Sequence, residues 1–172
     1  MNAAPGVKNK TISSQQIAGP WTLRFPAGWG APDSIKLSEL KPWKDLDLSP
    51  EGKAFSGTAT YSTTFTVDNA SANKEYMLDL GVVDMAAKIA VNGKEAGKLL
   101  APPYQVSLKD LVKQGENVLS IEVTSTWFNR LVFDAGQAEE KRKTWTIAGP
   151  GKDSPLRIAG LMGPVMIKVG GN

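Results

Sequence analysis

The sequence predicts a single all-β domain, an antiparallel β-sandwich of the jelly-roll type. Three observations predict this fold: short segments alternate apolar and polar residues, turn signals separate them at regular spacing, and almost no segment has a helical period. The 172 residues fit one domain, which at this size buries roughly 70% of the surface exposed by its unfolded chain. We assign residues 1–14 to a polar tail and residues 15–172 to the sandwich.

The strands follow from alternation along the chain. Period-two patterns cover residues 60–67, 76–82, 87–91, 117–123 and 165–169. After the third of these, Asn92-Gly93 supplies the positive φ angles that a tight hairpin turn needs. We expect the inward residues to share one core between two antiparallel sheets, among them Leu80, Ile89, Val91, Leu119, Ile121 and Val165.

Two segments depart from the strand pattern. Residues 108–114 are predicted as a helical turn, which Ser107 is placed to cap and Gly115 to end. Residues 133–163 form an irregular stretch that is too long for an idle connection in a compact domain, so it is either functional or disordered.

Composition excludes several classes of function. The net charge of +3 comes from scattered residues, with no basic run longer than Lys141-Arg142-Lys143, so we expect no nucleic-acid partner. The chain has no cysteine and no histidine, which removes disulfides, thiol nucleophiles and the commonest general base. No apolar run approaches the roughly 20 residues that span a membrane, and residues 1–10 have no apolar signal-peptide region. We therefore expect no membrane partner.

Three blocks of motifs occur in order along residues 19–169. They are Gly19-Pro20-Trp21, residues 40–43 and residues 55–61; then residues 78–84, residues 91–94, Gly97, Pro102-Pro103-Tyr104 and Gly115-Glu116-Asn117; then residues 127–131 and 160–165. Their order and spacing resemble the sugar-binding domain of family 2 type glycoside hydrolases, above all the version appended to α-L-rhamnosidases of the family 106 type. The resemblance implies a galactose-binding-like fold and an accessory role in a secreted or periplasmic enzyme with a linked catalytic domain.

Strand directions predict which end of the sandwich binds a ligand. One end collects compact polar turns, and the other collects aromatic and planar polar groups. Sugars offer an apolar C–H face and a rim of hydroxyls, so a sugar site needs the aromatic and planar polar groups of the second end. The candidate ligand residues at this end are Trp43, Asp84, Tyr104, Trp127, Asn129, Arg130 and Trp145.

Each candidate also has a structural interpretation. We favour exposure for Trp43 because it lies in a loop, whereas Tyr104 and Trp127 fit a core or capping role equally well. Asn129 and Arg130 fit a structural clamp better than sugar contact, with Arg130 bridging loop carbonyls or pairing with Asp84 or Asp134. Trp145, in the long irregular stretch, is the best single candidate for stacking on a sugar.

Catalysis by the chain alone is not expected. A glycosidase needs two carboxylates across a cleft, and Glu139-Glu140 lie in a charged run while Asp45 and Asp47 lie in a loop. Without histidine there is no ordinary hydrolase triad. No cofactor is required, although a structural calcium ion on oxygen ligands stays an open alternative.

The sequence thus predicts a non-catalytic carbohydrate-binding module that attaches a glycoside hydrolase to plant or microbial polysaccharide. The main alternative is a structural sandwich that packs against a rhamnosidase-like catalytic domain and binds no sugar. A small esterase or lyase on the same scaffold is the third.

Overall fold

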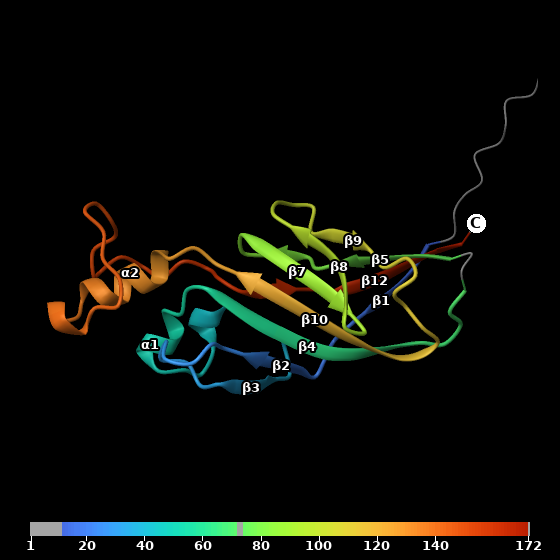
Figure 1. Cartoon of the computed structure of the whole chain (residues 1–172), viewed down its shortest axis with the longest axis horizontal. Coiled ribbons are helices and arrows are strands. Elements are labelled where there is room, and N and C mark those ends of the chain that lie inside the picture. Colours follow the sequence, from blue (N-terminus) through green and yellow to red (C-terminus); the bar gives the residue numbers. More distant parts are fainter. Residues whose placement is uncertain (1–11, 72–73, 172) are drawn as a thin grey trace, which may run out of the picture.

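The computed structural model describes residues 12–71 and 74–171, and its strands form two large antiparallel sheets and one small one (Figure 1). The first sheet has the order β3 (Ser34–Leu37), β2 (Trp21–Arg24), β4 (Thr58–Val67), β10 (Gly115–Thr124), β7 (Ala86–Val91) and β8 (Lys94–Leu99). The second has the order β1 (Ile12–Gln16), β12 (Met166–Gly171), β5 (Lys74–Asp79) and β9 (Gln105–Ser107). A small sheet pairs β6 (Val82–Val83) with β11 (Leu161–Gly163). The expected antiparallel β-sandwich is confirmed.

Four short helical segments complete the described chain. They are η1 (Trp43–Asp45), α1 (Pro50–Lys53), α2 (Phe128–Ala135) and η2 (Glu139–Lys141). Figure 1 shows α1 and α2 at one end of an elongated molecule and the C-terminal end of β12 at the other. We call the end with α1 and α2 the helical pole. No helix in the described ranges is long and apolar enough to cross a membrane.

The core lies between the two large sheets, as alternation predicts. All six expected core residues are at most 1% exposed: Leu80, Ile89, Val91, Leu119, Ile121 and Val165. In the first sheet Ile121 lies opposite Tyr61 on one side and Ile89 on the other, so the apolar face runs across strands. The Asn92-Gly93 turn has the positive φ angles expected of it, 52° and 78°.

The alternation fails at one position, Val82, which is 58% exposed although its pattern predicts an inward side chain. The preceding residue explains this failure. Gly81 has φ 64°, and a Cβ there would lie 2.4 Å from the carbonyl oxygen of Gly163. The left-handed backbone at Gly81 shifts the side-chain parity, so the residue that follows it turns outward.

Two boundary predictions also need correction. Residues 108–111 form a turn rather than the predicted helical turn, because Asp110 has φ 63° and so cannot continue a right-handed helix. Strand β1 begins at Ile12, so residues 12–14 of the predicted tail belong to a sheet. Residues 1–11 of that tail lie outside the described residues.

Candidate functional site

The helical pole is organised around the buried guanidinium of Arg130. This side chain is 1% exposed and lies 5.3 Å from the ring centre of Trp29 and 5.1 Å from that of Phe133. Its Nε and Nη2 donate to the two carboxylate oxygens of Asp134 at 3.0 and 2.7 Å, and its Nη1 donates to Glu51 at 2.8 Å. The clamp interpretation of Arg130 is therefore confirmed, with Asp134 rather than Asp84 as its partner.

Asp134 ties the following loop to α2. Besides the two bonds from Arg130, its Oδ2 accepts from the amide of Lys143 at 3.2 Å and from the amide and hydroxyl of Thr144, each at 2.7 Å. Burial pulls the pKa of this carboxyl upward, but the bonds from Arg130 and Thr144 outweigh burial and leave the pKa below its usual value. The carboxylate is thus a charged anchor for the start of the irregular stretch.

Glu51, on helix α1 and far from α2 in the sequence, completes this anchor. It accepts from Arg130 and, at 2.9 Å, from the Nζ of Lys143, and these two bonds lower its pKa. The Nζ of Lys143 also lies 5.7 Å from the ring centre of Trp29 and donates to the carbonyl of Gly28. The sequence alone gave no signal for Trp29 or Glu51, because both are far from α2 along the chain.

Asn129 makes a second anchor on the returning chain. Its Nδ2 donates to the carbonyl of Arg157 at 2.9 Å, and its Oδ1 accepts from the amide of Arg157 at 2.8 Å. The guanidinium of Arg157 in turn stacks 3.6 Å above the ring centre of Phe128. Residues 136–158, which we call the arm, are therefore held near both ends, and the clamp interpretation of Asn129 is confirmed.

Two of the expected aromatic ligand residues, Trp43 and Tyr104, are buried and cannot stack on a sugar. Trp43 is 0% exposed, its Nε1 donates to the hydroxyl of Tyr61 at 2.6 Å, and its ring packs edge-on against Phe25 and Phe55. The expected exposure of Trp43 is wrong because η1 turns the indole into the core, beneath Gly160. A Cβ at Gly160 would lie 2.7 Å from the indole nitrogen.

Tyr104 has the capping role rather than an open one. It is 8% exposed, and its hydroxyl donates to the carbonyl of Met85 at 2.8 Å. Nearby, the amide of Asp84 donates to the carbonyl of Gly160 at 3.1 Å. The Asp84 carboxylate is half-buried, has no hydrogen-bond or ion-pair partner within residues 12–71 and 74–171, and has a pKa raised by burial. It lies outside the Arg130 network.

The other two candidate tryptophans, Trp127 and Trp145, are exposed. Trp127 is 46% exposed, but one face packs on Trp29 with ring centres 5.3 Å apart. Trp145 is 77% exposed on the arm. It borders a shallow cavity of about 200 Å³, whose other lining residues are Leu131, Ala135, Arg142, Thr144, Thr146, Ile147, Gly149 and Pro150. Trp145 is thus a sequence-predicted residue that is both open and part of a cavity lining.

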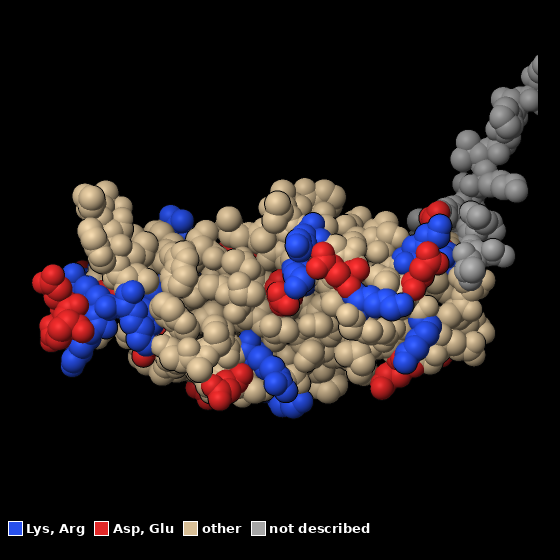
Figure 2. Space-filling view, viewed as in Figure 1, with Lys and Arg blue, Asp and Glu red and all other residues tan. Residues whose placement is uncertain are grey.

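Charged side chains of both signs surround the arm. Figure 2 shows acidic and basic side chains next to each other at the end of the molecule that carries α2 and η2. Glu139, Glu140, Lys141 and Arg142 are all exposed there. Among the residues that the structure describes, no three His, Cys, Asp or Glu side chains converge on a point that could hold a metal ion.

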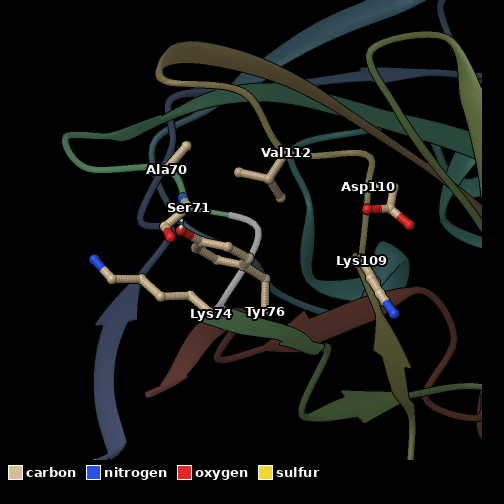
Figure 3. Close-up of a pocket in the computed structure, with 7 residues that line it drawn as sticks. All are labelled: Ala70, Ser71, Lys74, Tyr76, Lys109, Asp110 and Val112. Atoms are coloured by element: carbon tan, nitrogen blue, oxygen red, sulfur yellow. Dashed lines mark hydrogen bonds between the residues drawn. The ribbon is translucent and has the colours of Figure 1, made fainter. Parts of the chain in front are cut away.

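The opposite pole also has a cavity, of about 270 Å³, but with a different lining. Figure 3 shows the Tyr76 ring beside Ser71, with Lys109 and Asp110 on the far side of the cavity. The hydroxyl of Tyr76 accepts from the amide of Ser71 and donates to the carbonyl of Asn69, both at 3.3 Å, so it closes its own loop. This cavity has no tryptophan and no arginine in its lining.

Comparison with known proteins identifies the family. Residues 52–159 match the family model described as glycosyl hydrolase 2 galactose-binding domain-like. A putative beta-glucuronidase of Formosa agariphila is 39% identical over 121 residues, which are 69% of this chain and 10% of that protein. A rhamnosidase from Novosphingobium sp. PP1Y has a TM-score of 0.85 and 34% identity, over 97% of this chain and 16% of its own.

More distant structures share the fold alone. A β-D-glucuronidase from Dictyoglomus thermophilum has a TM-score of 0.68 at 17% identity, over 98% of this chain and 30% of its own. In every one of these matches the chain spans only a small part of the relative's length. The expected resemblance is confirmed, because the family model covers more than half of the sequence. This chain therefore belongs to the galactose-binding domain-like family of glycosyl hydrolase 2 domains.

Proposed function

We propose that this chain is the accessory domain of a glycoside hydrolase, and that it holds carbohydrate on the arm around Trp145. In this role it attaches a linked catalytic domain to plant or microbial polysaccharide and raises the local concentration of substrate. The names of two relatives, a beta-glucuronidase and a rhamnosidase, support a glycoside hydrolase as the parent protein. The chain spans 10% and 16% of these relatives, which leaves ample length for a separate catalytic domain.

The single observation that carries sugar binding is the open indole of Trp145 on an anchored arm. An exposed indole covers the C–H face of a pyranose, and such contacts dominate the affinity of many small sites. Because Asp134 and Asn129 hold the arm near its two ends, little conformational freedom remains to be lost on binding. The adjoining cavity adds hydroxyl and guanidinium groups that meet ring substituents.

A second candidate function is domain packing without sugar. Trp43 and Tyr104 are buried, so they stabilise the sandwich rather than meet a ligand. Several aliphatic side chains are instead exposed, with Ile147 at 95% and Leu100 at 78%. Exposed aliphatic groups of this kind favour contact with another protein surface.

The proposal needs neither catalysis nor a metal ion in this domain. The chain contains no histidine and no cysteine, and its buried carboxylate Asp134 is committed to Arg130 and the arm. We further propose a secreted or periplasmic location, where an enzyme meets polysaccharide.

A glycan array probed with the isolated chain tests this function, with the Trp145→Ala variant on a matched array. We expect weak but selective signals, with dissociation constants of roughly micromolar to millimolar, because a small shallow site gains about 4–8 kcal/mol. These signals should vanish in the variant. If the native chain binds no glycan but binds the remainder of its parent enzyme, the packing function replaces the one proposed.

A further inference from the structure

We infer that the arm cavity is built for an anionic sugar residue, with Arg142 binding a carboxylate or sulfate group while Trp145 stacks on the ring. This inference rests on the proposed function and names the ligand class of the same site. At about 200 Å³ the cavity is smaller than the roughly 300–1,000 Å³ of sites for drug-sized ligands, and it suits a single sugar ring.

The charge of the cavity points to an anion. Arg142 is the only charged residue among its lining residues, and no aspartate or glutamate lines it. The Nε of Arg142 donates to the carbonyl of Gln137 at 3.0 Å, which fixes the plane of the guanidinium. Its two terminal nitrogens have no hydrogen-bond or ion-pair partner within the described part of the chain. A planar guanidinium whose two terminal nitrogens are both free to donate can bind a carboxylate in a bidentate arrangement.

Neighbouring acids are not available to neutralise Arg142. Asp134 is occupied by Arg130 and Thr144, and Glu51 is occupied by Arg130 and Lys143. Glu139 and Glu140, on η2 just before Arg142, make no ion pair with it in the described residues. Within the described residues, the Arg142 guanidinium therefore has no carboxylate ion-pair partner, and it lines the same cavity as the open indole of Trp145.

The hydroxyl groups of the cavity fit the same ligand class. Thr144 donates its hydroxyl proton to Asp134, and Thr146 donates its own to the carbonyl of Ala148 at 3.3 Å. Both hydroxyl oxygens are therefore left as acceptors, which suits the hydroxyl donors of a sugar ring. No carboxylate or amide side chain lines the cavity, and these are the groups that a neutral sugar needs for paired contacts. Recognition consequently depends on the one charged group.

Calorimetric titration with four oligosaccharides tests the inference: an oligogalacturonate, its methyl ester, a sulfated galactan fragment and a neutral galactan fragment. We expect at least one anionic probe to bind the native chain at least tenfold more tightly than its neutral counterpart. Binding of the oligogalacturonate assigns a carboxylate, and binding of the sulfated fragment alone assigns a sulfate ester. The preference should weaken as salt is raised from 20 to 500 mM (about 22 to 4 Å in Debye length).

Variants distinguish recognition by Arg142 in the cavity from nonspecific attraction of an anion to any positive charge on the arm. Arg142→Gln should abolish the preference, Arg142→Lys should retain part of it, and Lys152→Gln, an exposed charge on the arm outside the cavity lining, should leave it unchanged. The inference is overturned if each anionic probe binds no more tightly than its neutral counterpart, or if Arg142→Gln and Lys152→Gln lose binding equally. If neutral and anionic probes bind alike and Trp145→Ala removes both, the anionic site is wrong while sugar binding stands. If the native chain binds none of the four, the anionic site is wrong, and the glycan array alone decides whether the chain binds another sugar.

Discussion

The guanidinium of Arg130 and the carboxylate of Asp134 face each other one turn apart on α2, joined by two hydrogen bonds, and each side chain is only 1% exposed. A buried ion pair of this kind is stable only while both partners stay in place. Because the same carboxylate accepts from Lys143 and Thr144, the pair also fixes the position of the arm that carries Trp145.

Removing the charge of Asp134 should loosen the domain and its arm together. We expect Asp134→Asn to lower the free energy of unfolding by about 3–5 kcal/mol, because it leaves a buried guanidinium with only Glu51. Urea denaturation measures the loss, and hydrogen exchange should accelerate at the amides of Lys143 and Thr144. The control is Asp45→Asn, whose exposed pair with Lys44 is 3.4 Å long and should matter little. Equal losses in the two variants would contradict the anchor.

The carboxylate of Asp84, which has no partner among the described residues, gives a pH-dependent prediction. Burial raises its pKa above the value of about 3.9 for a free Asp, so the folded state retains its proton more strongly than the unfolded state does. The associated stability is therefore present below about pH 3.9 and is lost as pH rises through the raised pKa.

Asp84→Asn removes this charge and should raise the melting temperature at pH 7, with a smaller gain at pH 3.5. Calorimetric melting at both values measures the difference. A variant that is less stable at pH 7 would mean that the Asp84 carboxylate has a favourable contact.

Core packing can be tested on one strand with a matched pair. Ile121 is 0% exposed, whereas Val118, on the same strand β10, is 50% exposed. Ile121→Ala should cost about 2–5 kcal/mol through lost burial and a residual cavity. Val118→Ala should cost well under half as much. Similar denaturation midpoints for the two variants would place Ile121 outside the core.

The isolated chain should hydrolyse neither glycosides nor acyl esters. It has no histidine or cysteine to act as base or nucleophile. Chromogenic rhamnoside, galactoside and acetyl ester substrates provide the assay. Turnover that disappears when Asp45, Asp47 or Asp134 is changed to Ala would reverse this expectation.

The sandwich could be predicted because strand alternation and burial have the same period. Alternation fails after Gly81, and the predicted helical turn fails at Asp110, because each of these residues has a positive φ that no local period reveals. Helix α2 was missed for a different reason. Its buried residues are Asn129, Arg130, Val132 and Asp134, so polar groups occupy the face on which an apolar period would normally appear.

The part of the site that is local in sequence could be predicted, whereas the part that depends on distant residues could not. Arg142, Thr144, Trp145 and Ile147 are close in sequence, so the run that forms the cavity was singled out as one irregular stretch. The partners that fix it are not local: Glu51 and Trp29 both contact Lys143 of the arm, although they lie far from it in the sequence. Burial of Trp43 depends likewise on Gly160 and Tyr61, which no local pattern reveals.

The most direct test of sugar binding compares the two poles by calorimetry. Polysaccharide-derived oligosaccharides are titrated into the native chain, into Trp145→Ala on the arm, and into Lys94→Ala, whose exposed side chain begins β8 away from the arm. We predict that Trp145→Ala weakens binding at least tenfold, a loss of about 1.4 kcal/mol, with little change in melting temperature, and that Lys94→Ala changes neither. Equal affinities for all three proteins would contradict a site on the arm.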